Sequence, residues 1–219
     1  MPHDTSRGFF ITFEGIDGSG KTTQLRELAQ LLEARKEPVT ATRQPGGTRI
    51  GDRIRGLLLD SRTEHLTAMT ELGLMFSDRA QCIAEVIRPA LDTGRIVLCD
   101  RYTDSTEAYQ GGGRQLGSTV VRHMHELMCG GLDPDLTILL MPDFHRSLMR
   151  ATRRNGSAAQ PGKDEGRFKT EDELFYRRVF SKYREIANRD TERVVVIESD
   201  QNIKEIHQLL VRIVAERRL

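Results

Sequence analysis

The chain has 219 residues, of which 37% are hydrophobic and 30% are charged. This composition is sufficient for a substantial core and excludes a chain that is disordered throughout. The 33 Lys and Arg residues nearly balance the 32 Asp and Glu residues, leaving a net charge of +1. No global attraction to nucleic acid or to a membrane surface is therefore indicated.

Short apolar runs along the chain predict five β-strands. Each run is continuous rather than alternating with polar residues, which is typical of strands in a parallel sheet with helices on both faces. The predicted strands lie at residues 9–13, 39–42, 95–99, 136–141 and 194–197. Helical periodicity predicts helices at about 21–35, 66–91, 103–110, 118–129, 143–153, 171–188 and 202–217.

This alternation of strands and helices predicts one α/β domain over residues 1–219, with a five-stranded parallel sheet and helices on both faces. Ligands of such folds bind at the carboxyl ends of the strands. One segment differs in composition, because residues 153–166 (RRNGSAAQPGKDEG) contain almost nothing to bury. They predict a mobile loop between two helices, and composition alone fits a tolerated surface insertion equally well.

The cysteines and the N-terminal residues indicate which cellular compartment to expect. Cys82, Cys99 and Cys129 are an odd number of widely spaced residues, so they predict neither a disulfide framework nor a CxxC zinc site. The first eight residues are polar and no long apolar run follows them. We therefore expect no signal peptide, no membrane span and a cytoplasmic protein.

A phosphate-binding motif follows the first predicted strand. Residues 15–22 (GIDGSGKT) fit GxxxxGK[ST], and the strand before and helix after them are the context that a P-loop requires. The loop N–H groups and the helix N-terminus bind phosphate, Lys21 reaches the outer phosphates, and the Thr22 hydroxyl is a Mg²⁺ ligand. A GTPase would also carry an NKxD motif, which is absent here.

Other polar residues also follow strand ends. Asp100 comes at the end of the third predicted strand, where a carboxylate can hold Mg²⁺ or its water shell, and Arg101 beside it can bind a second phosphate. Arg43 begins the RQPGGT segment after the second strand, and Arg55 follows in the next segment. Both arginines can face the same cleft.

Two predicted helices carry side chains suited to a nucleobase. Phe76 and Arg79 are three residues apart and share a helix face, so an aromatic plane and a guanidinium lie together. Thr106 and Gln110 are four apart and can present a hydroxyl and an amide to the same base. Each pair is a weak signal alone, since a helical Phe more often belongs to the core.

Taken together, these segments resemble the bacterial thymidylate kinases, in the same motif order from about residue 9 to about residue 206. The segments are FEGIDGSGKTTQ, RQPGGT, GDRIR, MFSDRAQ and DRYTDSTEAYQGGGR, followed by a late arginine-rich loop. The resemblance implies a P-loop NTPase fold of the nucleoside monophosphate kinase type. It also implies transfer of a phosphoryl group from ATP to dTMP with Mg²⁺, giving dTDP for dTTP synthesis.

The resemblance assigns roles to individual residues. It implies that Phe76 stacks on thymine, that Arg79 contacts one edge of the base, and that Thr106 and Gln110 contact its other edge. It also implies that Tyr109 packs beneath the sugar and disfavours a 2′-hydroxyl. It places Arg101 and Arg55 near the monophosphate and Asp17 toward the acceptor.

The expected catalytic residues are Lys21, Asp17, Arg101 and Arg153. The expected nucleotide-binding residues are Gly15, Ile16, Asp17, Gly18, Ser19, Gly20, Lys21, Thr22 and Thr23. The expected substrate-binding residues are Arg43, Arg55, Phe76, Arg79, Arg101, Thr106, Tyr109 and Gln110, and the expected metal ligands are Thr22 and Asp100.

The resemblance also implies a mobile lid at about 150–170 and a homodimer packed through the long helix at about 66–91. The variable P-loop position is Gly18 rather than a basic residue. The positive charge that neutralises the transferred phosphoryl group is therefore expected from lid arginines such as Arg153. Three features depart from the family pattern, one of which is a lid loop longer than is common, with residues 160–163 (QPGK) inside it. Gln44 replaces the Glu of REPGGT, and Lys169 replaces the Glu of the lid ending.

Two rival functions remain open at this point. One is a kinase of another pyrimidine monophosphate, such as dUMP or dCMP, because an amide can read several pyrimidines. The other is a nucleotide-binding switch that has lost phosphoryl transfer, which the Gln44 and Lys169 departures could favour. The partners expected are the small molecules ATP and dTMP, with no nucleic acid and no membrane.

Overall fold

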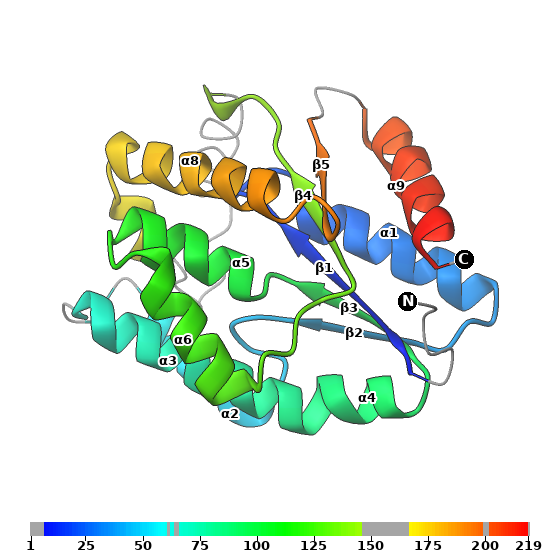
Figure 1. The fold of residues 1–219 in the computed structure, drawn as a ribbon, viewed down its shortest axis with the longest axis horizontal. Coiled ribbons are helices and arrows are strands. Elements are labelled where there is room, and N and C mark those ends of the chain that lie inside the picture. Colours follow the sequence, from blue (N-terminus) through cyan, green and yellow to red (C-terminus); the bar gives the residue numbers. More distant parts are fainter. Residues whose placement is uncertain (1–6, 61, 64–65, 146–166, 199–201, 219) are drawn as a thin grey trace.

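A five-stranded parallel sheet forms the centre of the computed structural model (Figure 1), which describes residues 7–60, 62–63, 66–145, 167–198 and 202–218. The strands occur in the spatial order β2-β3-β1-β4-β5, and every neighbouring pair is parallel. Their bounds are β1 (Phe9–Glu14), β2 (Val39–Arg43), β3 (Ile96–Asp100), β4 (Leu136–Leu140) and β5 (Val194–Ile197). The five predicted strands and the fold class are therefore confirmed.

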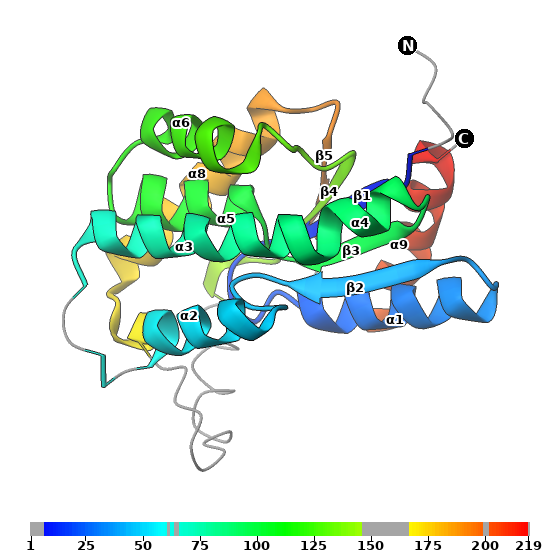
Figure 2. The ribbon, with the colours of Figure 1, turned by 90° about the horizontal axis from the view of Figure 1, so that it is seen from below.

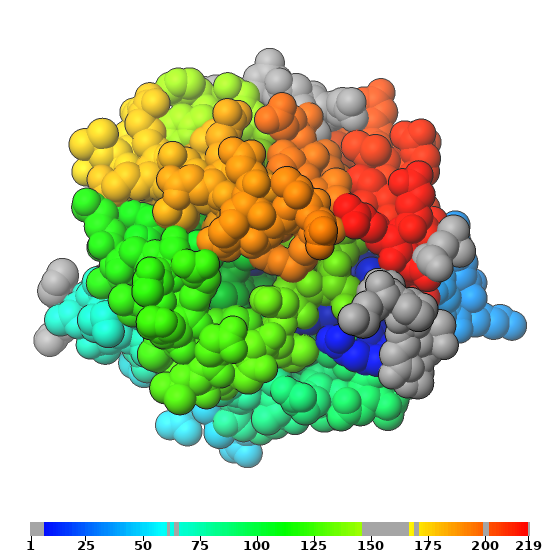
Figure 3. Space-filling model, in the orientation of Figure 1, coloured from blue at the N-terminus to red at the C-terminus, as the bar shows by residue number. Residues whose placement is uncertain are grey.

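Helices cover both faces of the sheet, as Figure 2 shows from a second direction. Ile11 and Phe13 of β1 pack against α1 (Lys21–Ala34) and α9 (Ile203–Arg217). Phe10 of the same strand packs on the opposite face, against α3 (Ala68–Cys82), α4 (Arg88–Asp92) and α6 (Ser118–Cys129). A third cluster joins Leu139 of β4 to α8 (Glu173–Arg189). Helices α6, α8 and α9 cover much of the face seen in Figure 3.

The helices differ from prediction at several places. The helix α2 (Arg49–Leu59) was not predicted, and Thr48 caps it by accepting a hydrogen bond from the Gly51 N–H at 2.9 Å. The predicted stretch at 66–91 consists of α3, the π-helix η1 (Ile83–Ile87) and α4 in continuous sequence. Likewise α5 (Thr103–Thr106) continues into the π-helix η2 (Glu107–Gly113), and the 3₁₀ turn η3 (Arg167–Thr170) precedes α8.

Parallel pairing brings the polar strand ends to one edge of the sheet. Phe13 of β1 and Arg43 of β2 both lie in register with Asp100 of β3. The P-loop, the segment after β2 and the segment after β3 therefore begin side by side. The predicted lid and the predicted helix at 143–153 lie largely outside the described residues. No helix within the described part of the chain is long and apolar enough to cross a membrane.

Candidate active site

The P-loop connects β1 to α1 through three glycines, Gly15, Gly18 and Gly20, whose positive φ angles other residues rarely adopt. Gly15 has φ 132°, and a Cβ there would lie 2.3 Å from the carbonyl oxygen of Leu140. Gly20 has φ 99°, in the left-handed region, at the N-cap position of α1. The first N–H groups of a helix have no acceptor within it, so the loop ends at a site suited to phosphate.

Lys21, the first residue of α1, lies folded over the P-loop. Its side chain is only 6% exposed, and Nζ donates a hydrogen bond to the Ile16 carbonyl at 2.8 Å. Burial lowers the pKa of Lys21 to about 8, and the positive charge of Arg101 acts in the same direction. The ammonium group therefore already lies within the loop that would hold the phosphates.

Thr22 and Asp100 form a direct pair beside the P-loop. The Thr22 hydroxyl donates to Asp100 Oδ2 at 2.6 Å. The described residues contain no group of three or more His, Cys, Asp or Glu arranged for a metal. A nucleotide-bound Mg²⁺ needs only one or two protein oxygens, because phosphates and water complete its shell. The Thr22 and Asp100 oxygens fit that donor set.

Arg101 joins the P-loop to the helix after β3. Its Nη2 atom lies 2.5 Å from Asp17 Oδ1, and Nη1 donates to the Gly15 carbonyl at 3.1 Å. The guanidinium carbon lies 5.2 Å from the centroid of the Tyr109 ring. The structure thus brings Asp17, which is 84 residues from Arg101 in the sequence, next to Arg101 and Tyr109.

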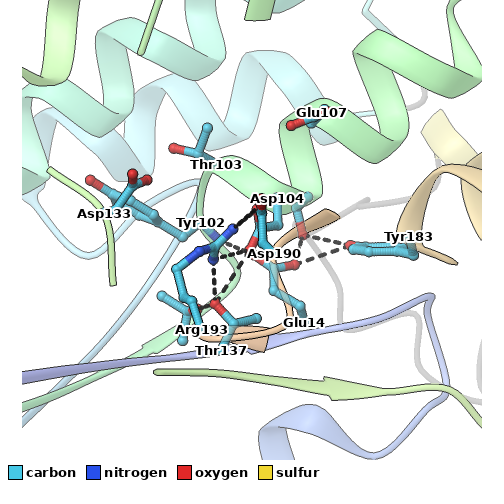
Figure 4. A network of polar contacts seen from close by, with 12 residues as sticks. Glu14, Tyr102, Thr103, Asp104, Glu107, Asp133, Thr137, Tyr183, Asp190 and Arg193 are labelled. Atoms are coloured by element: carbon cyan, nitrogen blue, oxygen red, sulfur yellow. Dashed lines mark hydrogen bonds and ion pairs between the residues drawn. The ribbon is translucent and has the colours of Figure 1, made fainter. Parts of the chain in front are cut away.

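A buried carboxylate behind Arg101 was not predicted. Glu14 is 0% exposed and accepts a hydrogen bond from the Ser105 hydroxyl at 2.5 Å. It accepts a second one from the Tyr183 hydroxyl at 3.1 Å, as Figure 4 shows. The Ser105 hydroxyl in turn accepts from Arg101 Nη1 at 2.9 Å. Burial, followed by the nearby charge of Asp104, raises the pKa of Glu14 to about 7. A lone carboxylate at the end of an otherwise apolar strand is the signal that could have identified Glu14.

Arg79 is the centre of a second cluster, on the acceptor side. It is 2% exposed, its Cζ atom lies 4.9 Å from the centroid of the Phe76 ring, and Nη2 donates to the Thr106 hydroxyl at 2.8 Å. Its Nε donates to Gln44 Oε1 at 2.8 Å. Three predicted base-binding residues are therefore in contact. Phe76 also packs in the core, where it is 0% exposed.

Several buried polar atoms around this cluster have no hydrogen-bond partner among the described residues. They are Gln44 Nε2, Asp78 Oδ2, Arg79 Nη1 and Gln110 Oε1. Leaving a buried polar atom unpaired costs about 1–3 kcal/mol. Four such atoms at one edge of the sheet favour a polar ligand that pairs with them.

The remaining predicted residues lie at the margin of the site. Arg43 pairs with Asp52 at 3.2 Å, and both side chains are about half exposed. Arg55 Nη1 donates to the Pro45 carbonyl at 2.9 Å. The loop between them is held to α3, because the Gly46 N–H donates to Asp78 Oδ1 at 2.8 Å. Arg153 lies outside the described residues, and so does the side chain of Lys169.

These features define a class of protein. A P-loop, an adjacent Thr–Asp pair and a buried cluster with unpaired donors and acceptors lie at one edge of a parallel sheet. That combination is typical of a P-loop kinase acting on a small nucleotide acceptor.

Known proteins identify the family within that class. The family model for thymidylate kinase matches residues 13–210. The thymidylate kinase of Desulfovibrio desulfuricans is 48% identical over 192 residues, covering 88% of each chain. That of Pelobacter propionicus is 44% identical over 212 residues, covering 97% of this chain and 96% of its own. A crystal structure of thymidylate kinase from Ehrlichia chaffeensis is 31% identical, with a TM-score of 0.74 over 95% of this chain and 99% of that one. The chain therefore belongs to the thymidylate kinase family and is an enzyme, a kinase.

Proposed function

We propose that this chain transfers the γ-phosphoryl group of ATP to dTMP, with Mg²⁺, giving dTDP. The observation that carries the proposal is the pattern of unpaired donors and acceptors around Arg79, located at the same sheet edge as the P-loop. That pattern matches the thymine base, and the P-loop supplies the phosphate site of the donor.

On the donor side, the loop from Gly15 to Thr23 binds the phosphates of ATP. Its backbone N–H groups and the N-terminus of α1 face the phosphate oxygens, and Lys21 neutralises the outer ones. Thr22 and Asp100 would hold Mg²⁺ together with the nucleotide, supported by their contact at 2.6 Å. When bound, Mg²⁺ withdraws charge from the phosphate oxygens.

On the acceptor side, the proposal assigns one atom to each edge position of thymine. Arg79 Nη1 is a buried donor without a described partner, and it suits the 4-oxo oxygen. Gln110 Oε1 is a buried acceptor without a described partner, and it suits the N3–H. Cytosine carries an amino group at position 4 and no hydrogen at N3. It would therefore set donor against donor and acceptor against acceptor.

The other acceptor contacts follow from the same placement. Phe76 stacks on the base, Thr106 assists Arg79 at the base edge, and the buried Tyr109 hydroxyl lies beneath the sugar, where it disfavours a 2′-hydroxyl. Arg101, bound to Asp17 at 2.5 Å, orients the accepting phosphate toward ATP. We also assign phosphate binding to Arg43, Arg55 and the lid residue Arg153.

The test is release of ADP in a coupled assay with ATP, Mg²⁺ and each of dTMP, dUMP, dCMP, AMP, GMP and no acceptor. We expect strong turnover with dTMP. Equal or greater turnover with dCMP would contradict the assigned donor and acceptor atoms. ATP binding with no turnover of any acceptor would favour a binding role instead.

We also infer that the enzyme is a cytoplasmic homodimer packed through the helical stretch α3-η1-α4. Exposed apolar side chains beside it support this inference: Ile50 and Leu57 of α2 are 48% and 54% exposed, and Met69 of α3 is 56% exposed. Sedimentation equilibrium measures the mass directly. A monomer at micromolar concentration, or a dimer unaffected by Met69→Glu, would contradict the proposed interface.

A further inference from the structure

Glu71 of α3 is a buried carboxylate to which no role has yet been given. Its side chain is 0% exposed. Oε1 accepts a hydrogen bond from Gln110 Nε2 at 2.7 Å, and Oε2 accepts one from Arg114 Nη2 at 3.1 Å. Arg167 Nη2 also donates to Oε2. A fully buried carboxylate requires compensating charge, and the two guanidinium groups provide it.

The contact with Glu71 determines how the Gln110 amide is oriented. An ionised carboxylate has only acceptor atoms, so the amide must turn its NH₂ group toward Glu71. The reverse orientation would place the amide oxygen against the carboxylate oxygen. The contact therefore directs Gln110 Oε1 away from Glu71, and this oxygen is buried without a hydrogen-bond partner among the described residues.

We propose that Glu71 is a positioning residue that sets the base preference of the acceptor site by fixing the orientation of the Gln110 amide. With Oε1 directed to the ligand, the site binds pyrimidines that carry N3–H and excludes 4-aminopyrimidines. The inference rests on the proposed function, because it concerns the same acceptor site. It adds the reason why an amide, which in general can donate or accept, acts here only as an acceptor.

The experiment compares Glu71→Gln with a matched control. In Glu71→Gln the neighbouring side chain can donate as well as accept, so the Gln110 amide is free to turn. The control is Glu171→Gln, since Glu171 pairs with the same Arg114 Nη2 at 2.6 Å and makes no described contact with Gln110. Each variant is assayed for kcat/KM with dTMP and with dCMP.

We expect Glu71→Gln to lower the ratio of kcat/KM for dTMP over dCMP by about tenfold or more, since an unpaired buried group costs about that factor. Glu171→Gln should leave the ratio within about twofold. A Glu71→Gln variant that loses activity with both nucleotides equally would show a merely structural role and overturn the inference.

A charge-conserving exchange provides the rescue. In the double variant Glu71→Gln with Gln110→Glu, the amide and carboxylate change places, and the carboxylate at position 110 again presents an acceptor to N3–H. We expect the preference for dTMP to recover at least partly relative to Glu71→Gln. A double variant that folds, as shown by its melting curve, but has no greater preference than Glu71→Gln contradicts the inference.

Two further measurements keep the inference separate from folding and from the proposed function. If the Glu71 variants do not fold, hydrogen exchange of the Gln110 side-chain NH₂ in the wild-type protein tests the contact with Glu71. Slow exchange is expected, and fast exchange would refute the contact. If the wild type does not turn over dTMP, the proposed function fails. The ratio of dissociation constants for dTMP and dCMP then replaces kcat/KM, and an unchanged ratio in Glu71→Gln refutes the role of Glu71.

Discussion

Asp78 makes the stability of this protein depend on pH in an unusual direction. Its side chain is 1% exposed, Oδ1 accepts from the Gly46 N–H, and Oδ2 has no hydrogen-bond partner among the described residues. Burial raises the pKa of Asp78 from 3.8 to about 6. Replacement by Asn keeps the acceptor for Gly46 and removes the ionisation.

The magnitude follows from the difference between the folded and unfolded pKa values. Below pH 4 the carboxyl is protonated in both states and contributes nothing. Between pH 4 and 6 the unfolded chain has lost this proton while the folded one retains it, so the free energy of unfolding falls as pH rises. Above pH 6 the loss is complete and amounts to about 3 kcal/mol for a shift of about two units. Asp78→Asn avoids this loss.

Urea unfolding of the wild type and Asp78→Asn at intervals from pH 4 to pH 8 measures the effect. We expect the stability of the variant relative to the wild type to increase by up to about 3 kcal/mol over pH 4–6 and then to remain constant. Asp92→Asn, at an exposed position of α4, is the matched control and should give a nearly constant difference. A constant difference for Asp78→Asn as well would refute the reasoning.

Four further predictions concern activity. Lys21→Ala should lower kcat by at least about 10³-fold with an unchanged circular dichroism spectrum, and near-normal kcat would refute its role. Tyr109→Phe should reduce the preference for dTMP over its ribonucleotide about tenfold, measured as a ratio of kcat/KM, because it removes the hydroxyl that we propose lies beneath the sugar. Tyr183→Phe should lower kcat/KM for dTMP about tenfold and leave the affinity for ATP unaltered, because it removes the hydroxyl that contacts Arg101. An equal loss of ATP binding would contradict this prediction. Chelation of Mg²⁺ should abolish turnover, and added Mg²⁺ should restore it; residual activity in excess chelator would count against a Mg²⁺ requirement.

The sheet and the P-loop were predictable from sequence because their signals are local. A continuous apolar run predicts a buried strand wherever it occurs, and the P-loop motif fixes its own strand and helix. The helix α2 was missed because it contains Gly51 and Gly56 and follows Pro45, Gly46 and Gly47, and these residue types are typical of turns. Its cap at Thr48 was the available signal.

The buried polar network was not predictable, because its contacts join distant parts of the chain. Glu71 lies 39 residues from Gln110 and 96 from Arg167. From the sequence of its own helix, a glutamate at position 71 is expected to be exposed to solvent. It is buried because α3 packs against η2, where it contacts Gln110 and the neighbouring Arg114. The base-binding residues were named from the family resemblance. Their atomic roles remain predictions that the proposed assays will test.

Arg101 has φ 71°, a conformation that costs a residue with a side chain about 1–2 kcal/mol and costs glycine almost nothing. Gly or Asn at position 101 would relieve this backbone cost, but either substitution would also remove the contacts of the guanidinium with Asp17, the Gly15 carbonyl and Ser105. The backbone strain at Arg101 is therefore offset by the contacts of its own side chain, and we expect selection for heat resistance alone to gain little from substitution at this position.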